Sequence, residues 1–236
     1  MNDEPGGRDA APENPPDEVF VWDLAVRLFH WVLATLVLTS IVTGKTGDME
    51  IHMLSGFSIL ALVIFRLVWG VVGGRHARFR DFVRGPMAVI AYVKTHLKGD
   101  IPRYRGHNPG GGWAVLAMLG LLALQAGTGL FANDDILTEG PLMKFIEKGT
   151  SDYVTWIHFL SSNALIAVVV LHVAAISFYA WKGENLVRPM LTGRKPADPE
   201  APAHEKGGEA DPRGNLIAAL VILAAAAGVV WYIVNL

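Results

Sequence analysis

The sequence contains no cysteine, and only 18% of its 236 residues are charged. The absence of cysteine excludes disulfides, thiolate-bound iron–sulfur clusters and a haem attached covalently through C-x-x-C-H. Charge this sparse is unusual for a soluble domain. A net charge of −2 gives no reason to expect a nucleic-acid partner. Any metal held by this chain must therefore use ligands other than thiolates.

Hydrophobic residues make up 52% of the chain and gather in long blocks. Five blocks reach membrane-spanning length: 24–44, 51–73, 112–132, 153–181 and 216–234. At a rise of about 1.5 Å per residue, each can cross a hydrocarbon core about 30 Å thick. The sequence therefore predicts an all-α membrane protein with five transmembrane helices, the last of them C-terminal, in direct contact with membrane lipid.

The basic residues are distributed unevenly between the connections. Segment 74–111 has eight Lys or Arg and segment 182–214 has six, whereas 45–50 has one and 133–152 has two. The positive-inside rule places the two basic segments in the cytoplasm. We therefore expect a cytoplasmic N-terminus, an exterior C-terminus and five alternating crossings.

The remaining segments divide the chain into four parts. Residues 1–19, acidic and rich in proline, read as a disordered tail without the basic n-region of a signal peptide. Residues 20–188 form the four-helix membrane domain, 189–214 a flexible cytoplasmic linker, and 215–236 the additional helix. Within the domain, "GPMAVIAYVKTHLKG" predicts an amphipathic helix lying on the membrane surface.

Eight histidines are present. Four lie in the cytoplasmic connections, where solvation explains them: His76, His96, His107 and His204. The other four lie within or at the edge of spans: His30, His52, His158 and His172. Ionisable residues inside a membrane are costly and usually functional, although a hydrogen-bonded structural role explains any one of them equally well.

Helical geometry sorts these four histidines into two pairs. His158 and His172 are fourteen residues apart, which at about 100° per residue leaves them about 40° from the same face and about 21 Å apart along the axis. With the expected topology, His30 lies at the depth of His172, on the cytoplasmic side. His52 lies at the depth of His158, on the exterior side.

Two imidazoles from facing helices at matched depth are what a haem b needs as axial ligands, and helical bundles build such sites from inward side chains. Zinc normally requires four ligands close together, and a second pair about 20 Å away does not supply them. A proton relay favours interleaved carboxylates, and the first four blocks carry none below their ends. The pattern therefore favours two haems over zinc or proton transfer.

Two arginines and four glycines agree with haem binding. Arg66 lies fourteen residues after His52, and Arg27 lies one turn before His30. Both can pair with the propionates of the cytoplasmic-side haem, although Arg27 also suits an ordinary span-flanking role and Arg66 can snorkel. The glycines that permit close approach of helices or of a flat macrocycle are Gly44, Gly56, Gly127 and Gly129.

Several motifs resemble the bacterial cytochrome b-561 family, which includes the cytochrome b subunits of nickel–iron hydrogenases. The first span carries "RLFHW", the second "HMLSGFSILALVIFRLVWG", and the fourth its two histidines at 14-residue spacing. "RGHNPGGGW" followed by "GTGLF" is similar to the hydrogenase-type branch. The resemblance covers roughly residues 19–188, so the acidic tail and the fifth span lie outside it.

The resemblance implies a four-helix transmembrane bundle that holds two haems b in the bacterial inner membrane, with the C-terminal helix as an addition. It also implies that His30 and His172 ligate the cytoplasmic-side haem, and His52 and His158 the exterior-side haem. We expect electron transfer between the quinone pool and a periplasmic redox protein, either a c-type cytochrome or a hydrogenase-like protein. The acidic residues of segment 133–152 are a candidate docking surface for a basic partner, and a merely solvated loop explains them equally well. A homo-oligomer is left open.

Three alternatives remain at this point. A self-contained enzyme of the same fold can oxidise superoxide and reduce quinone without a partner protein. The histidines can instead serve transport of protons or metal ions, in a colourless protein. The chain can also be an anchoring subunit whose haem does not react with quinol at a useful rate.

Overall fold

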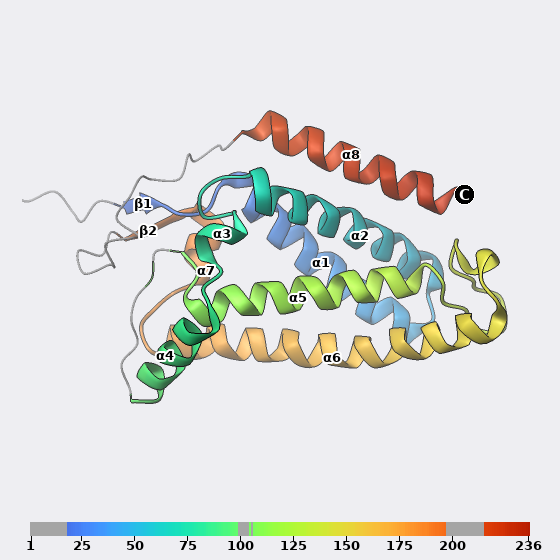
Figure 1. The fold of residues 1–236 in the computed structure, drawn as a ribbon, viewed down its shortest axis with the longest axis horizontal. Coiled ribbons are helices and arrows are strands. Elements are labelled where there is room, and N and C mark those ends of the chain that lie inside the picture. The colour runs from blue at the N-terminus through green and yellow to red at the C-terminus, as the bar shows by residue number, and fades with distance from the viewer. Residues whose placement is uncertain (1–17, 99–103, 105, 197–214) are drawn as a thin grey trace, which may run out of the picture.

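The computed structural model describes residues 18–98, 104, 106–196 and 215–236 (Figure 1). Within these residues five helices are long and apolar enough to cross a membrane. They are α1 (Leu24–Thr46), α2 (Met49–Val72), α5 (Pro109–Gly129), α6 (Lys148–Trp181) and α8 (Leu216–Val234). The predicted all-helical membrane fold is confirmed, and each helix overlaps the block from which it was predicted.

Capping residues set the hairpin between α1 and α2. The carboxylate of Asp23 accepts a hydrogen bond from the backbone N–H of Val26 at 2.7 Å and starts α1. Gly47 ends that helix with φ of 82°, a left-handed conformation that glycine adopts without strain. Asp48 then caps α2 through the N–H of Ile51 at 3.3 Å. Two consecutive caps therefore reverse the chain within a few residues.

Of the other spans, α5 begins and ends earlier than predicted, α6 begins earlier, and α8 has its predicted bounds. α5 starts earlier, because Asn108 accepts from the N–H of Gly111 at 2.6 Å and Pro109 suits the first helical position. α6 starts at Lys148 and has 34 residues, a length of about 51 Å. Because a membrane core is about 30 Å thick, α6 extends beyond it.

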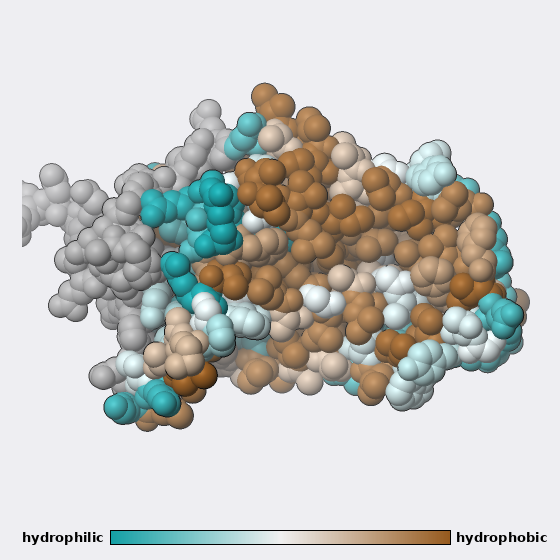
Figure 2. All heavy atoms as spheres, in the orientation of Figure 1, coloured by the Kyte–Doolittle hydropathy of each residue, from teal (hydrophilic) through white to brown (hydrophobic). Residues whose placement is uncertain are grey.

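The spanning helices pack in sequence around the bundle. α1 packs on α2, α2 on α5, and α5 on α6, while α8 lies along α2 (Figure 1). Among the described residues, α6 has few close backbone approaches to α1 or α2. Figure 2 shows an apolar surface along the length of the bundle and hydrophilic patches at both ends. The apolar band and the helix lengths fit a chain that spans a membrane.

Short elements gather at one end of the bundle, which we call the basic end. They are β1 (Glu18–Phe20), α3 (Phe79–Phe82), α4 (Pro86–Leu97), α7 (Val187–Thr192) and β2 (Arg194–Pro196). The opposite end, the loop end, carries the α1–α2 turn and the α5–α6 connection, which includes the 3-10 helix η1 (Met143–Phe145). α4 forms where an amphipathic helix was predicted, and no residue of it is buried.

The ends of the membrane domain differ from the predicted boundaries. β1 pairs antiparallel with β2, with Val19 opposite Lys195, and Glu18 forms an ion pair with Arg188 at 2.9 Å. Part of the predicted tail 1–19 and the first residues of the predicted linker 189–214 thus form a strand pair and α7. The rest of the tail, residues 1–17, and of the linker, 197–214, lies outside the described residues. Long-range strand pairing of this kind leaves no periodic signal in the sequence.

Candidate haem sites

The structure brings the four span histidines together in two pairs. His30 of α1 faces His172 of α6 with ring centroids 6.4 Å apart. We call these two residues the basic-end pair. His52 of α2 faces His158 of α6 with ring centroids 6.2 Å apart, and these two form the loop-end pair. The pairs are the ones that helical depth predicted.

The separation of the rings suits axial ligation of one metal by both members of each pair. Imidazole–metal bonds are about 2.0–2.1 Å long. With about 1.2 Å more from each nitrogen to its ring centroid, two axial imidazoles have centroids about 6.4 Å apart. The observed 6.4 and 6.2 Å match this value. The described residues contain no group of three or more His, Cys, Asp or Glu that could hold a metal ion, so paired ligation fits better than a zinc cage.

Backbone carbonyls orient both rings of the loop-end pair. Nδ1 of His52 lies 2.9 Å from the carbonyl oxygen of Ser40, and Nδ1 of His158 lies 3.0 Å from that of Gln125. Because a carbonyl only accepts, each Nδ1 carries the proton and donates it. The lone pair of each ring is then on Nε2, the tautomer that binds metal.

Gln125 also contacts the ring of His158 through its side chain. Its amide nitrogen lies 2.9 Å from Nε2 and 3.2 Å from Nδ1, so it can donate to Nε2, the nitrogen that would bind a metal. The hydroxyl of Ser161 donates to the side-chain oxygen of Gln125 at 2.5 Å. Gln125 is not among the residues predicted from the sequence, although a lone amide side chain within the apolar span α5 is the signal that could have identified it.

Glycines provide the space for the loop-end rings. A Cβ placed on Gly44 would lie 2.9 Å from the ring of His52, and one on Gly129 would lie 3.1 Å from the ring of His158. Cβ atoms on Gly56 and Gly127 would meet nothing within 4 Å. At two of the four predicted glycines, a larger residue would crowd a histidine ring. The other two border open space, where a Cβ would touch nothing.

Polar atoms without partners gather at the basic end. Five buried side-chain nitrogens have no hydrogen-bond partner among the described residues: Arg27 Nε, His30 Nδ1, Arg66 Nη1, His96 Nδ1 and His107 Nδ1. Leaving a buried donor unpaired costs about 1–3 kcal/mol, so five in one region call for a polar or anionic group. The haem propionates are such a group for the two arginines, whose charge suits them, whereas His107 lines a separate cavity at the same end.

The two arginines of this region are held by different contacts. Arg66 is only 3% exposed and its guanidinium lies over the ring of Phe79, 4.9 Å from the centroid, so it does not snorkel to the surface. Arg27 donates from Nη1 to the carbonyl of Leu191 at 2.5 Å. Burial raises the pKa of the Asp23 carboxyl. Hydrogen bonds from Val26 and Trp69, and the positive charges of Arg66 and Arg27, oppose this rise.

The connection histidines are less solvated than expected. His107 packs against the rings of Trp22 and Phe82, with centroids 4.7 and 4.5 Å away. Burial, together with the nearby charge of Arg66, lowers the pKa of His107 to about 3, so its ring is neutral at pH 7. Solvation therefore fails as the explanation for His107, and for His96, whose Nδ1 is buried. His204 lies outside the described residues.

The acidic segment at the loop end uses most of its carboxylates internally. Asp134 accepts from three backbone N–H groups, those of residues 136, 137 and 138, at 2.8–3.0 Å. Lys148 forms ion pairs with both Asp135 and Asp152. Three of the five acidic residues are thus satisfied within the loop. This finding weakens the predicted docking surface, because charges that are paired locally attract a distant partner less.

The chain is similar to known proteins over most of its length. A family model described as prokaryotic cytochrome b561 matches residues 21–193. Three curated relatives are each named as a probable Ni/Fe-hydrogenase B-type cytochrome subunit. The protein from Cupriavidus necator is 25% identical, with 74% of this chain and 85% of the relative covered. Those from Bradyrhizobium diazoefficiens and Rhodobacter capsulatus are each 22% identical, covering 75% of this chain and 85% and 81% of the relatives.

The matched region begins just before α1 and ends just after α7. It contains both histidine pairs, Arg27, Arg66 and the first four spanning helices, whereas α8 lies outside it. This match extends over most of the chain, and the family it describes consists of membrane cytochromes of the b type, which carry haem and transport electrons. The chain belongs to the prokaryotic cytochrome b561 family.

Proposed function

We propose that this protein is a diheme cytochrome that transfers electrons between the membrane quinone pool and a redox protein in the periplasm. The observation that carries the proposal is the presence of two pairs of facing imidazoles, with ring centroids 6.4 and 6.2 Å apart, on three spanning helices. Fourteen residues of α6 separate the pairs, a distance of about 21 Å along the helix. The two sites together therefore cover most of the membrane thickness.

The basic-end pair, His30 and His172, would hold one haem b, and the loop-end pair, His52 and His158, the other. When bound, haem supplies a one-electron iron couple, and two axial histidines leave no open position on the iron. Arg27 and Arg66 would pair with the propionates at the basic end, where the unpartnered nitrogens lie.

The protein's own groups fix the ligands and exclude water. The carbonyls of Ser40 and Gln125 hold the loop-end rings in the metal-binding tautomer. The apolar side chains of the spans keep water away from both sites, so that each potential is set by the local field of the protein.

The orientation follows from the distribution of charge. The basic end would face the cytoplasm, together with the N-terminus, and the loop end would face the periplasm, together with the C-terminus of α8. A periplasmic partner would then meet the loop-end site. The relatives' names make a hydrogenase-like protein one candidate partner, and a c-type cytochrome is the other.

Anaerobic reduction by quinol tests this function. The purified haem-loaded chain in nanodiscs is mixed with a soluble quinol, and the haem bands are followed by stopped-flow spectroscopy. We expect reduction of both haems, followed by rapid reoxidation when a periplasmic redox protein is added. Haems that stay oxidised in the presence of quinol would indicate an anchoring subunit instead.

Two further arms separate the remaining alternatives. Superoxide generated enzymatically, with quinone present and no partner protein, should give no sustained quinone reduction. Sustained reduction there would indicate a self-contained superoxide:quinone oxidoreductase. A purified protein without haem would indicate transport of protons or metal ions.

A further inference from the structure

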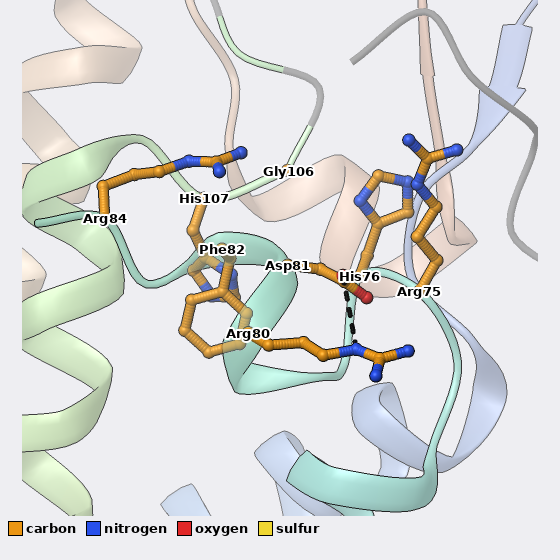
Figure 3. A pocket seen from close by; sticks show the side chains of 8 residues that line it. All are labelled: Arg75, His76, Arg80, Asp81, Phe82, Arg84, Gly106 and His107. Atoms are coloured by element: carbon orange, nitrogen blue, oxygen red, sulfur yellow. Dashed lines mark ion pairs between the residues drawn. The ribbon is translucent and has the colours of Figure 1, made fainter. Parts of the chain in front are cut away.

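The basic end contains a cavity of about 200 Å³ that the proposed electron transfer does not use. It lies between the segment that follows α2 and the segment that enters α5, and Figure 3 shows its side chains. The groups that line it and matter here are Arg75, His76, Arg80, Arg84 and His107. Three guanidinium groups and two imidazoles thus surround one small space.

A single carboxylate, that of Asp81, lines the same cavity, and it is already engaged. It forms an ion pair with Arg78 at 2.7 Å and a longer one with Arg80 at 3.8 Å. Arg84 has no ion-pair partner among the described residues. In Figure 3 it extends toward the cavity from the side opposite to His76 and Arg75. Arg84 therefore adds a positive charge to the cavity that no carboxylate among the described residues neutralises.

His107 gives the cavity a hydrogen-bonding group without adding charge. Its ring is neutral at pH 7, because burial depresses its pKa, and its Nδ1 has no hydrogen-bond partner among the described residues. The ring of Phe82 lies against it, 4.5 Å between centroids, and keeps it in place. Such a combination of arginines and a neutral imidazole suits an anionic oxygen group better than a metal ion.

Two features place the cavity at the level of lipid headgroups. Its arginines follow α2 directly, within twelve residues of Val72. Trp113, 46% exposed, donates its indole N–H to the carbonyl of Arg84 at 2.8 Å, and tryptophan with one polar contact is typical of the membrane interface. On the other side α4 exposes Met87, 74% exposed, and Leu97, 82% exposed, as expected of a helix lying in the interface.

We infer that this cavity binds the phosphate of an anionic phospholipid headgroup. The inference goes beyond the proposed electron transfer and does not depend on it. Basic pockets between transmembrane helices are a recurrent site for such headgroups. The depth of the cavity, between Trp113 and α4, favours a phosphate carried by a lipid over one dissolved in the cytoplasm.

The test uses the full haem-loaded chain in nanodiscs of mixed phosphatidylglycerol and phosphatidylcholine. Lipids that remain bound after gentle release are counted per chain by native mass spectrometry. We expect phosphatidylglycerol to be retained in preference to phosphatidylcholine. Arg84→Gln should weaken this retention by about ten-fold or more, the effect of losing a hydrogen bond between charged groups, without changing the haem content.

Lys94→Gln is the matched control, since it removes one exposed charge from α4 at the same end without touching the cavity. Equal losses in both variants would overturn the inference, because they would indicate general surface attraction. Displacement of the lipid by inorganic phosphate would also overturn it, in favour of a soluble anion.

A change in the haem spectrum without a change in lipid retention would assign the cavity to the haem site and overturn the inference. Should Arg84→Gln reduce the amount of folded protein, Arg80→Gln provides the second variant, because the Arg80 side chain is 74% exposed. The same preferential loss of phosphatidylglycerol is expected there.

Discussion

The two histidine pairs have nearly the same ring separation but different surroundings. At the loop end, both rings donate from Nδ1 to a backbone carbonyl, at 2.9 and 3.0 Å. Glycines lie directly against these rings. At the basic end, Nδ1 of His30 has no partner among the described residues, and the other unpartnered nitrogens belong to two arginines and two histidines.

This difference indicates how the fold prepares each site. The loop-end ligands are positioned by the helix backbones, so their orientation is fixed by the packing of α1 and α5 against α2 and α6. The basic-end ligands lie among positive and neutral donors that suit an anionic group. Backbone carbonyls raise the basicity of a ligand and positive charge opposes oxidation, so the two haems should differ in potential.

Removing single ligands should give the largest effect. Because His52 and His158 would ligate one haem, alanine at either position should remove the same haem and leave about one per chain. His30→Ala or His172→Ala should remove the other. Haem content and low-temperature spectra check this expectation. Loss of both haems from a folded single variant, or different spectra for His52→Ala and His158→Ala, would contradict the pairing.

Adding a methyl group beside a loop-end ring should give the next largest effect. In Gly44→Ala the new Cβ would lie 2.9 Å from the ring of His52, closer than ordinary contacts allow, so the ring must move. We expect a lower occupancy of the loop-end haem and an unchanged basic-end haem. Gly120→Ala is the control, because its Cβ would meet nothing within 4 Å. Equal effects of both substitutions would show that crowding at the ring is not the cause.

The reduction potentials of the two haems provide a finer test of the difference between the loop-end and basic-end sites. We expect the loop-end haem to have the lower potential, because both of its ligands donate to carbonyls. Arg66→Gln removes a buried positive charge at the basic end, so it should lower the basic-end potential by on the order of 60 mV, a tenfold change for a one-electron couple. Potentiometric titration measures both values. A shift confined to the loop-end haem would contradict the assignment of Arg66.

The smallest expected effect concerns pH. The pKa of His107 is about 3 in the folded protein against an ordinary 6.5, so between these values the unfolded chain binds the additional proton. Stability from this residue is therefore complete above pH 6.5 and decreases as the pH falls toward 3. His107→Gln should reduce the fall in thermal midpoint between pH 7 and pH 5. The same fall in both proteins would show that other groups cause it.

The sequence predicted the features that depend on local geometry. Helical rise and periodicity placed His158 and His172 on one face of α6, and charge asymmetry set the depths of His30 and His52. These arguments need no knowledge of how the helices pack. The five spans could be predicted for the same reason, since apolar length alone defines them.

Features that depend on tertiary contacts could not be predicted. The pairing of β1 with β2, the burial of His107 between Trp22 and Phe82, and the contact of Gln125 with His158 join segments far apart in the chain. The acidic loop illustrates the same limit, because Lys148 neutralises Asp135 and Asp152 only once the loop has folded. Charge counted along the sequence therefore overestimated the field at the loop end.

The most direct test of the central claim is the dithionite-reduced minus oxidised spectrum of the purified chain, with haem quantified per chain. Two low-spin b haems per chain are predicted, because each pair of facing histidines would ligate one. A single haem would leave one pair without its proposed role, and a colourless protein would contradict the account as a whole.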